Sequence, residues 1–96
     1  MPLLTDSQID HALGSLPGWA RDGNALVRQF TFRSFPEAVA FVNRLVPHAE
    51  AADHHPDLLV SYRRVTVRWS THSDGGITEK DVAGARMADQ ESAAGG

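Results

Sequence analysis

The segment DLLVSYRRVTVRWS, residues 57–70, decides the fold. In its second half, valine and tryptophan alternate with polar residues, which is the pattern of a strand with one buried face. Residues 57–62 and 65–70 are therefore predicted as two strands joined tightly at Arg63-Arg64. Strands that are joined by so short a connection run antiparallel, so this segment predicts an antiparallel sheet.

A second hairpin is predicted nearer the start of the chain. Asp22-Gly23 is a turn signal, because glycine adopts the positive φ that tight turns require. Residues 19–21 and 25–32 flank this turn and are predicted as its two strands, with leucine and phenylalanine on one face of the second. The two hairpins together supply four strands for a single sheet.

Capping patterns predict the starts of three helices. Residues 5–8 (TDSQ) and 34–37 (SFPE) have the spacing of a capping box, and residues 78–81 (TEKD) begin with a capping threonine. The middle helix is expected to end near His54, because Pro56 disfavours helical geometry at the residue before it. The order helix, hairpin, helix, hairpin, helix predicts an α+β fold, with a four-stranded antiparallel sheet and helices packed on one face.

Length and composition limit the class of protein. The 96 residues predict a single domain, 1–96, and the small polar residues from about Gln90 predict a frayed tail. A net charge of -3 and a pI of about 5.9 argue against a nucleic-acid-binding surface. The chain has no cysteine, no secretory signal and no segment near the roughly 20 apolar residues that span a bilayer. We therefore expect a soluble, cytoplasmic protein without disulfides.

Histidines gather in one part of the chain, where four of the five lie between residues 48 and 72. His54 and His55 are expected at the end of the long helix, and His72 directly after the last strand, where side chains project into an open rim. The two adjacent histidines can converge on one site because the chain changes direction at Pro56. Imidazole, with an unperturbed pKa of about 6.5, serves as acid or base at neutral pH, so these residues predict proton transfer.

Each of these residues also has a structural interpretation. Two adjacent histidines are, on composition alone, more often solvated or structural than catalytic. Asp81 can complete a helix cap, and Tyr62, which offers a ring for stacking, can be an ordinary strand residue. Three histidines can also hold zinc, but no cysteine, HExxH motif or regular ligand spacing supports a metal site.

Seven positions together match a known pattern. The chain resembles the active-site signature of the pterin-4a-carbinolamine dehydratase family at Glu50, His54, His55, Pro56, Tyr62, His72 and Asp81. The surrounding sequence is similar as well, including GW at 18–19 and GIT at 76–78. Seven positions in order make a more specific signal than a single short motif. The resemblance covers about residues 5–90.

The resemblance implies a reaction and a set of partners. The expected substrate is 4a-hydroxytetrahydropterin, the pterin-4a-carbinolamine, which loses water to give quinonoid dihydropterin in tetrahydropterin recycling. Neither a metal nor a cofactor is expected. A homodimer or homotetramer is implied, together with a functional link to an aromatic amino acid hydroxylase that produces the carbinolamine. The alternative from another class is a non-catalytic dimerisation or assembly partner of the same fold.

The resemblance also gives each residue a role. His54 and His72 are assigned the proton transfers, with acid and base left open between them. His55 is assigned substrate binding, with help in proton removal. Asp81 is expected to orient a neighbouring imidazole. Glu50 either contacts the polar edge of the pterin or steadies His54, which lies four residues later on the expected helix.

Overall fold

The computed structural model describes residues 2–94, and its elements follow the predicted order. Eight elements succeed one another along the chain: α1 (Asp6–Leu13), β1 (Ala20–Asp22), β2 (Ala25–Thr31), α2 (Phe35–Ala52), β3 (Asp57–Ser61), β4 (Arg64–Trp69), the short 3-10 helix η1 (His72–Asp74) and α3 (Glu79–Ala94). The predicted α+β fold of two hairpins and three longer helices is therefore confirmed.

The predicted caps are present at the starts of the first two helices. At α1, the Gln8 amide donates to Thr5 Oγ1 at 3.1 Å, and the Thr5 amide donates to Gln8 Oε1 at 2.9 Å. At α2, Ser34 Oγ accepts from the Glu37 amide at 3.3 Å. These bonds satisfy amide groups that have no partner inside the helix, which is why the helices begin at these residues.

The four strands form one antiparallel sheet in the order β1-β2-β4-β3. The hairpins meet where β2 pairs with β4, with Leu26 opposite Trp69 and Phe30 opposite Val65. Every second residue of β4 is buried, as its alternating sequence predicted. β1 and β3 are consequently the two edge strands of the sheet.

The turn between β3 and β4 differs from the prediction by one residue. Strand pairing closes with Ser61 opposite Arg64, so the turn consists of Tyr62 and Arg63 rather than Arg63-Arg64. Tyr62 has a φ of 55°, and a positive φ at the first central residue is the pattern of a type II′ turn. Glycine usually occupies that position, so a tyrosine gave no signal for it.

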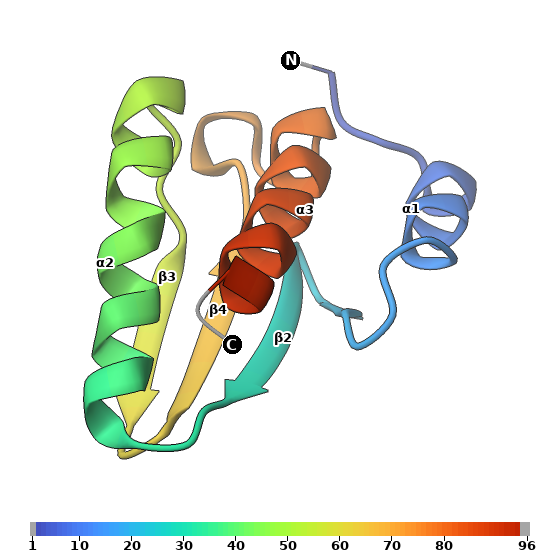
Figure 1. Ribbon diagram of the computed structural model, residues 1–96. Coiled ribbons are helices and arrows are strands. Elements are labelled where there is room, and N and C mark those ends of the chain that lie inside the picture. Colours follow the sequence, from blue (N-terminus) through green and yellow to red (C-terminus); the bar gives the residue numbers. More distant parts are fainter. Residues whose placement is uncertain (1, 95–96) are drawn as a thin grey trace.

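α2 and α3 lie side by side across one face of the sheet, as predicted (Figure 1). α1 lies on the side of α3 that faces away from α2, and it contributes Ile9 to the core. α3 passes so close to β4 that a Cβ added at Gly84 would lie only 2.6 Å from the ring of Trp69. The largest fully buried side chains are Trp69, Phe41, Leu16, Leu26 and Leu45.

The end of the chain is more ordered than the sequence indicated. We expected fraying from about Gln90, but α3 continues to Ala94, and residues 95–96 lie outside the described part. Glu91 explains the difference, because its carboxylate bonds His48 Nε2 at 2.8 Å and its carbonyl accepts from Arg44 Nε at 3.1 Å. These bonds fasten the last turns of α3 to α2.

Candidate active site

Four segments meet at one end of the molecule: the end of α2, the start of β3, the η1 loop after β4 and the start of α3 (Figure 1). α2 ends at Ala52, slightly earlier than expected, because Asp53 adopts a left-handed conformation with φ 49° and ψ 44°. The amide of His54 then bonds back to the Ala49 carbonyl at 3.1 Å. This reversal sends the two following histidine side chains to different partners.

His54 is turned into the protein. Its Nε2 lies 2.7 Å from Oδ1 of Asp81, and the two side chains are 11% and 0% exposed. The imidazole also stacks on the indole of Trp69, with ring centroids 5.4 Å apart and 24° between the planes. His54 is therefore held on two sides, by a buried carboxylate and by a flat aromatic ring.

The carboxylate of Asp81 is hydrogen-bonded at both oxygens. Oδ2 accepts from Thr71 Oγ1 at 2.8 Å and from the Thr78 amide at 2.9 Å. The two threonine hydroxyls bond each other at 2.8 Å, and Thr78 Oγ1 also accepts from the Lys80 amide at 3.2 Å. The predicted cap at the start of α3 is thus present, and its carboxylate is also bonded to His54 from the segment that follows α2. Several donors of this kind offset the cost of burying a charge.

His55 forms a separate and more open pair. Its Nε2 lies 2.5 Å from Oε2 of Glu50, with side chains 54% and 68% exposed. Of the two roles expected for Glu50, a contact to the polar edge of the pterin and a pair with His54 through i, i+4 spacing, the pair with His54 is not observed. Because α2 stops at Ala52, His54 does not continue the helix face that carries Glu50, and its side chain turns to Asp81. His55 lies beside Glu50 instead.

His72 projects from the η1 loop. Its side chain is exposed. Thr71, the residue before it, bonds the following loop through its backbone. The Thr71 amide donates to the Gly76 carbonyl at 2.9 Å, and the Thr71 carbonyl accepts from the Gly75 amide at 2.9 Å. Since the Thr71 hydroxyl also reaches Asp81, the loop that carries His72 is tied to the partner of His54. Pro56, half-buried, leads from the histidine pair into β3.

Tyr62 does not join this group within the chain. It lies in the β3–β4 turn and is 71% exposed. The site is at the opposite end of that hairpin, where β3 begins and β4 ends (Figure 1). Five strand residues at about 3.3 Å each separate Pro56 from Tyr62. Its predicted stacking role therefore lacks support from this arrangement.

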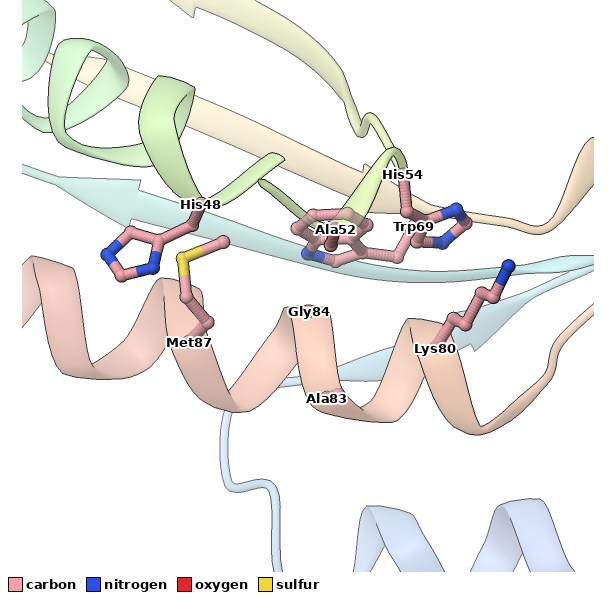
Figure 2. A pocket seen from close by; sticks show the side chains of 8 residues that line it. All are labelled: His48, Ala52, His54, Trp69, Lys80, Ala83, Gly84 and Met87. Carbon is pink, nitrogen blue, oxygen red and sulfur yellow. The ribbon is translucent and has the colours of Figure 1, made fainter. Parts of the chain in front are cut away.

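A cavity of about 260 Å³ lies between α2 and α3 beside His54. Figure 2 shows His54 and Lys80 at one end, His48 and Met87 at the other, and the ring of Trp69 between them, behind Ala52. Its wall is completed by Ala52, Ala83 and Gly84.

Three residues at this site were missed from the sequence. The sequence predicts Trp69 only as part of the buried face of a strand, and it gives no signal for Lys80 or Thr71. Their contacts join segments that are distant along the chain, and no local spacing encodes such contacts.

The arrangement suits proton transfer. A carboxylate that orients one nitrogen of an imidazole leaves the other nitrogen available to exchange a proton with a bound molecule. Within residues 2–94, no group of three or more His, Asp or Glu side chains is arranged to hold a metal ion. What the geometry offers is therefore acid–base chemistry from histidines that carboxylates steady.

Comparison with known proteins gives a consistent result. The pterin 4 alpha carbinolamine dehydratase family matches residues 2–91. A protein of Mycobacteroides abscessus named "putative pterin-4-alpha-carbinolamine dehydratase" is 50% identical over 91 residues, covering 95% of this chain and 97% of its own. A protein of Thermomicrobium roseum with the same name is 51% identical over 86 residues, covering 90% and 92%.

Solved structures share the fold. A transcriptional coactivator/pterin dehydratase from Brucella melitensis superposes with a TM-score of 0.90 at 37% identity, over 94% of this chain and 98% of that one. A pterin dehydratase-like protein described as a RuBisCO assembly factor in the alpha-carboxysome has a TM-score of 0.66 at 23% identity, over 78% and 89%, which is a likeness of fold alone. The chain belongs to the pterin 4 alpha carbinolamine dehydratase family.

Proposed function

We propose that this protein is a 4a-hydroxytetrahydropterin dehydratase that works by histidine acid–base catalysis. The substrate loses the hydroxyl at C4a and the proton at N5, which leave together as water. A double bond forms between C4a and N5. The products are quinonoid dihydropterin and water. The family membership supports the substrate class, and general acid–base assistance typically contributes about 10²–10⁴-fold to each such step.

The observation that carries this proposal is the pair formed by His54 and Asp81. Its 2.7 Å separation and near-complete burial give an imidazole of fixed orientation, which a proton-transfer group requires. His72, on the loop tied to Asp81 through Thr71, is proposed as the second proton-transfer residue.

The remaining residues are proposed to bind and orient the substrate. His55, exposed and paired with Glu50, is suited to contact a polar heterocycle and to assist proton removal. Glu50 is assigned to steady His55, and Pro56 to fix the direction in which the chain leaves the histidine pair. The proposed chemistry uses neither a metal nor a cofactor.

A stopped-flow assay of carbinolamine breakdown tests the proposal. The wild-type protein should accelerate dehydration above the spontaneous rate, and His72→Ala should lower kcat by about 10²-fold or more. His11→Ala is the matched control, because His11 is exposed on α1. Undiminished catalysis in folded His72→Ala would reject the role of His72. A wild-type protein that leaves the spontaneous rate unchanged would reject the enzymatic function.

A non-catalytic role as a dimerisation or assembly partner is the second candidate. The Brucella melitensis relative is described as a transcriptional coactivator as well as a pterin dehydratase. The same assay separates the two candidates, since a pure assembly partner would bind its target without accelerating dehydration.

Self-association is part of the proposal. β3 is an edge strand, and its three apolar residues Leu58, Leu59 and Val60 are 36%, 65% and 37% exposed. Exposed apolar edges are usually covered in native proteins, and a second copy of the chain would cover this one. We therefore infer a homodimer or homotetramer.

The setting of the enzyme is inferred from its substrate. An aromatic amino acid hydroxylase is the class of enzyme that would supply the carbinolamine, which gives the proposed functional link. The cytoplasm is the proposed location of both. None of the helices within residues 2–94 has the length and apolar character needed to cross a lipid bilayer.

A further inference from the structure

The hydroxyl groups around Asp81 admit one consistent direction of hydrogen bonding. Each threonine hydroxyl has a single proton. Thr71 Oγ1 lies 2.8 Å from Asp81 Oδ2 and donates to it, so the 2.8 Å bond between the hydroxyls is donated by Thr78. Thr78 Oγ1 in turn accepts from the Lys80 amide at 3.2 Å. The chain of donors thus runs from the α3 amide through both hydroxyls to the carboxylate.

Oδ2 of Asp81 is an acceptor in this network, because it receives Thr71 Oγ1 and the Thr78 amide at the N-terminal end of α3. An ionised carboxylate is an acceptor only, so Asp81 Oδ1 has no proton to offer to His54. The 2.7 Å bond must therefore be donated by His54 Nε2, so that Nε2 carries the proton and Nδ1 is bare in the neutral ring.

We propose that Thr71 is a positioning residue, whose hydroxyl holds the Asp81 carboxylate where Oδ1 accepts from His54 Nε2 and so fixes His54 in the tautomer with a free Nδ1. The catalytic use of Nδ1 rests on the proposed dehydratase function, whereas the tautomer itself does not. Within residues 2–94, Thr71 is the side-chain donor to Oδ2. It is 3% exposed, so water does not replace its bond when the hydroxyl is lost.

Thr71 also joins the two proposed proton-transfer histidines. Its side chain bonds the partner of His54, and its backbone, bonded to Gly75 and Gly76, shapes the loop that begins with His72. A valine at position 71 would keep the branched shape and the backbone bonds and remove only the hydroxyl proton. Thr71→Val therefore separates the positioning role from the shape of the loop.

Nitrogen-15 NMR of the imidazoles tests the tautomer directly. In the wild-type protein, neutral His54 should show a protonated Nε2 and a bare Nδ1. Thr71→Val should populate the opposite tautomer, and Thr71→Ser, which restores the hydroxyl, should return the wild-type spectrum. Thr66→Val is the matched control, because Thr66 lies on β4, the strand that leads to Thr71, and makes no bond to Asp81. A wild-type His54 with a protonated Nδ1, or a Thr71→Val spectrum identical to wild type, would overturn the proposal.

Kinetics supply the second readout. We expect Thr71→Val to lower kcat by about 10- to 100-fold, the range typical for the loss of an outer partner of a histidine. Thr71→Ser should recover most of that loss. If the wild-type protein fails to dehydrate the carbinolamine, the dehydratase function is rejected, and the tautomer is still decided by the spectra. The wild-type spectrum also decides the tautomer if the Thr71→Val chain does not fold.

Discussion

Asp81 combines two roles in a single carboxylate. One oxygen accepts from the Thr78 amide and so closes the first turn of α3, and the other receives His54 at 2.7 Å. Its side chain is fully buried, so neither bond can be exchanged for one to water. Loss of this carboxylate should therefore reduce stability and activity together.

Replacement of Asp81 by asparagine is the direct test of this dual role. Asp81→Asn should lower kcat by about 10²–10⁴-fold, because the amide can present an N–H to His54 and favour the other tautomer. The free energy of unfolding should fall by about 1–3 kcal/mol, since buried donors lose a charged acceptor. Stopped-flow dehydration and urea denaturation measure the two effects.

Asp89 provides a control on the same helix. Its Oδ1 accepts from Trp19 Nε1 at 2.9 Å and from Arg28 at 2.7 Å, away from the proposed site. Asp89→Asn should therefore cost stability while kcat stays near the wild-type value. Wild-type kcat in Asp81→Asn would contradict the role given to that residue.

Glu50 should matter more for activity than for stability. Its pair with His55 is exposed at both side chains, and such pairs contribute less than about 1 kcal/mol. Glu50→Gln should leave the urea midpoint nearly unchanged and lower kcat/KM by about tenfold, because His55 loses the partner that orients it. Glu91→Gln is the matched control, since Glu91 makes a similar 2.8 Å pair with His48. Equal effects of both substitutions on kcat/KM would exclude a specific role for Glu50.

Sequence reasoning recovered the individual side chains better than their contacts. The spacing of His54, His55, His72 and Asp81 identified the candidate residues, and the cap at Asp81 followed from its place three residues after Thr78. One of the two roles expected for Glu50, the pair with His54, was wrong, because it assumed a helix that continued through His54. The bond from Thr71 to Asp81 had no local signal, since it joins a strand end to a helix.

At the level of elements, the close contact between α3 and β4 sets the position of the His54 site. Gly84 lets the helix backbone approach Trp69, and that ring in turn supports the imidazole of His54. Trp69 is 1% exposed, so it has little room to move away from a larger residue at position 84. The glycine thus affects the position of His54 through Trp69.

Gly84→Ala should destabilise the protein although alanine favours helices by about 1 kcal/mol over glycine. The new Cβ would meet three ring atoms of Trp69 at 2.6–2.8 Å, and overpacking of this kind typically costs about 1–3 kcal/mol. We expect a lower urea midpoint and a reduced kcat, because the displaced indole shifts His54. In a Trp69→Leu background the same change should become neutral or stabilising. Stabilisation by Gly84→Ala alone would contradict the clash.

Element order was predictable from the sequence, but element ends were less so. The alternation in β4 and the caps at Thr5 and Ser34 correctly located strands and helices. Two of the errors fall where a non-glycine residue adopts a positive φ, at Asp53 and Tyr62. Such conformations are set by the surrounding chain rather than by the residue's own preference, so local pattern does not reveal them.

At the scale of the whole molecule, the sheet has two unequal edges. β1 is three residues long, whereas β3 is longer and exposes Leu58, Leu59 and Val60. Short edge strands resist further pairing, and longer apolar ones invite it. The β3 edge is therefore the expected surface for self-association.

Leu59→Lys should dissociate the assembly. Leu59 is 65% exposed in the single chain, so lysine there would leave the fold intact and place a charge in the contact between copies. Light scattering after size exclusion should show the mass of one chain, 10.4 kDa, in place of a multiple. Gln29→Lys, on the exposed part of a central strand, is the control and should keep the assembly. An unchanged mass for Leu59→Lys would exclude this edge.

Asp81 is buried and His72 is exposed, so the two residues should differ in how readily they change among related sequences. In a relative that no longer needs to turn over a pterin, selection for folding would still preserve the buried carboxylate of Asp81. The exposed His72 on η1 would be free to change. A relative that retains Asp81 but has replaced His72 is therefore expected to have lost catalysis and kept the fold. Position 72, rather than position 81, should therefore distinguish working enzymes from their scaffold-only kin.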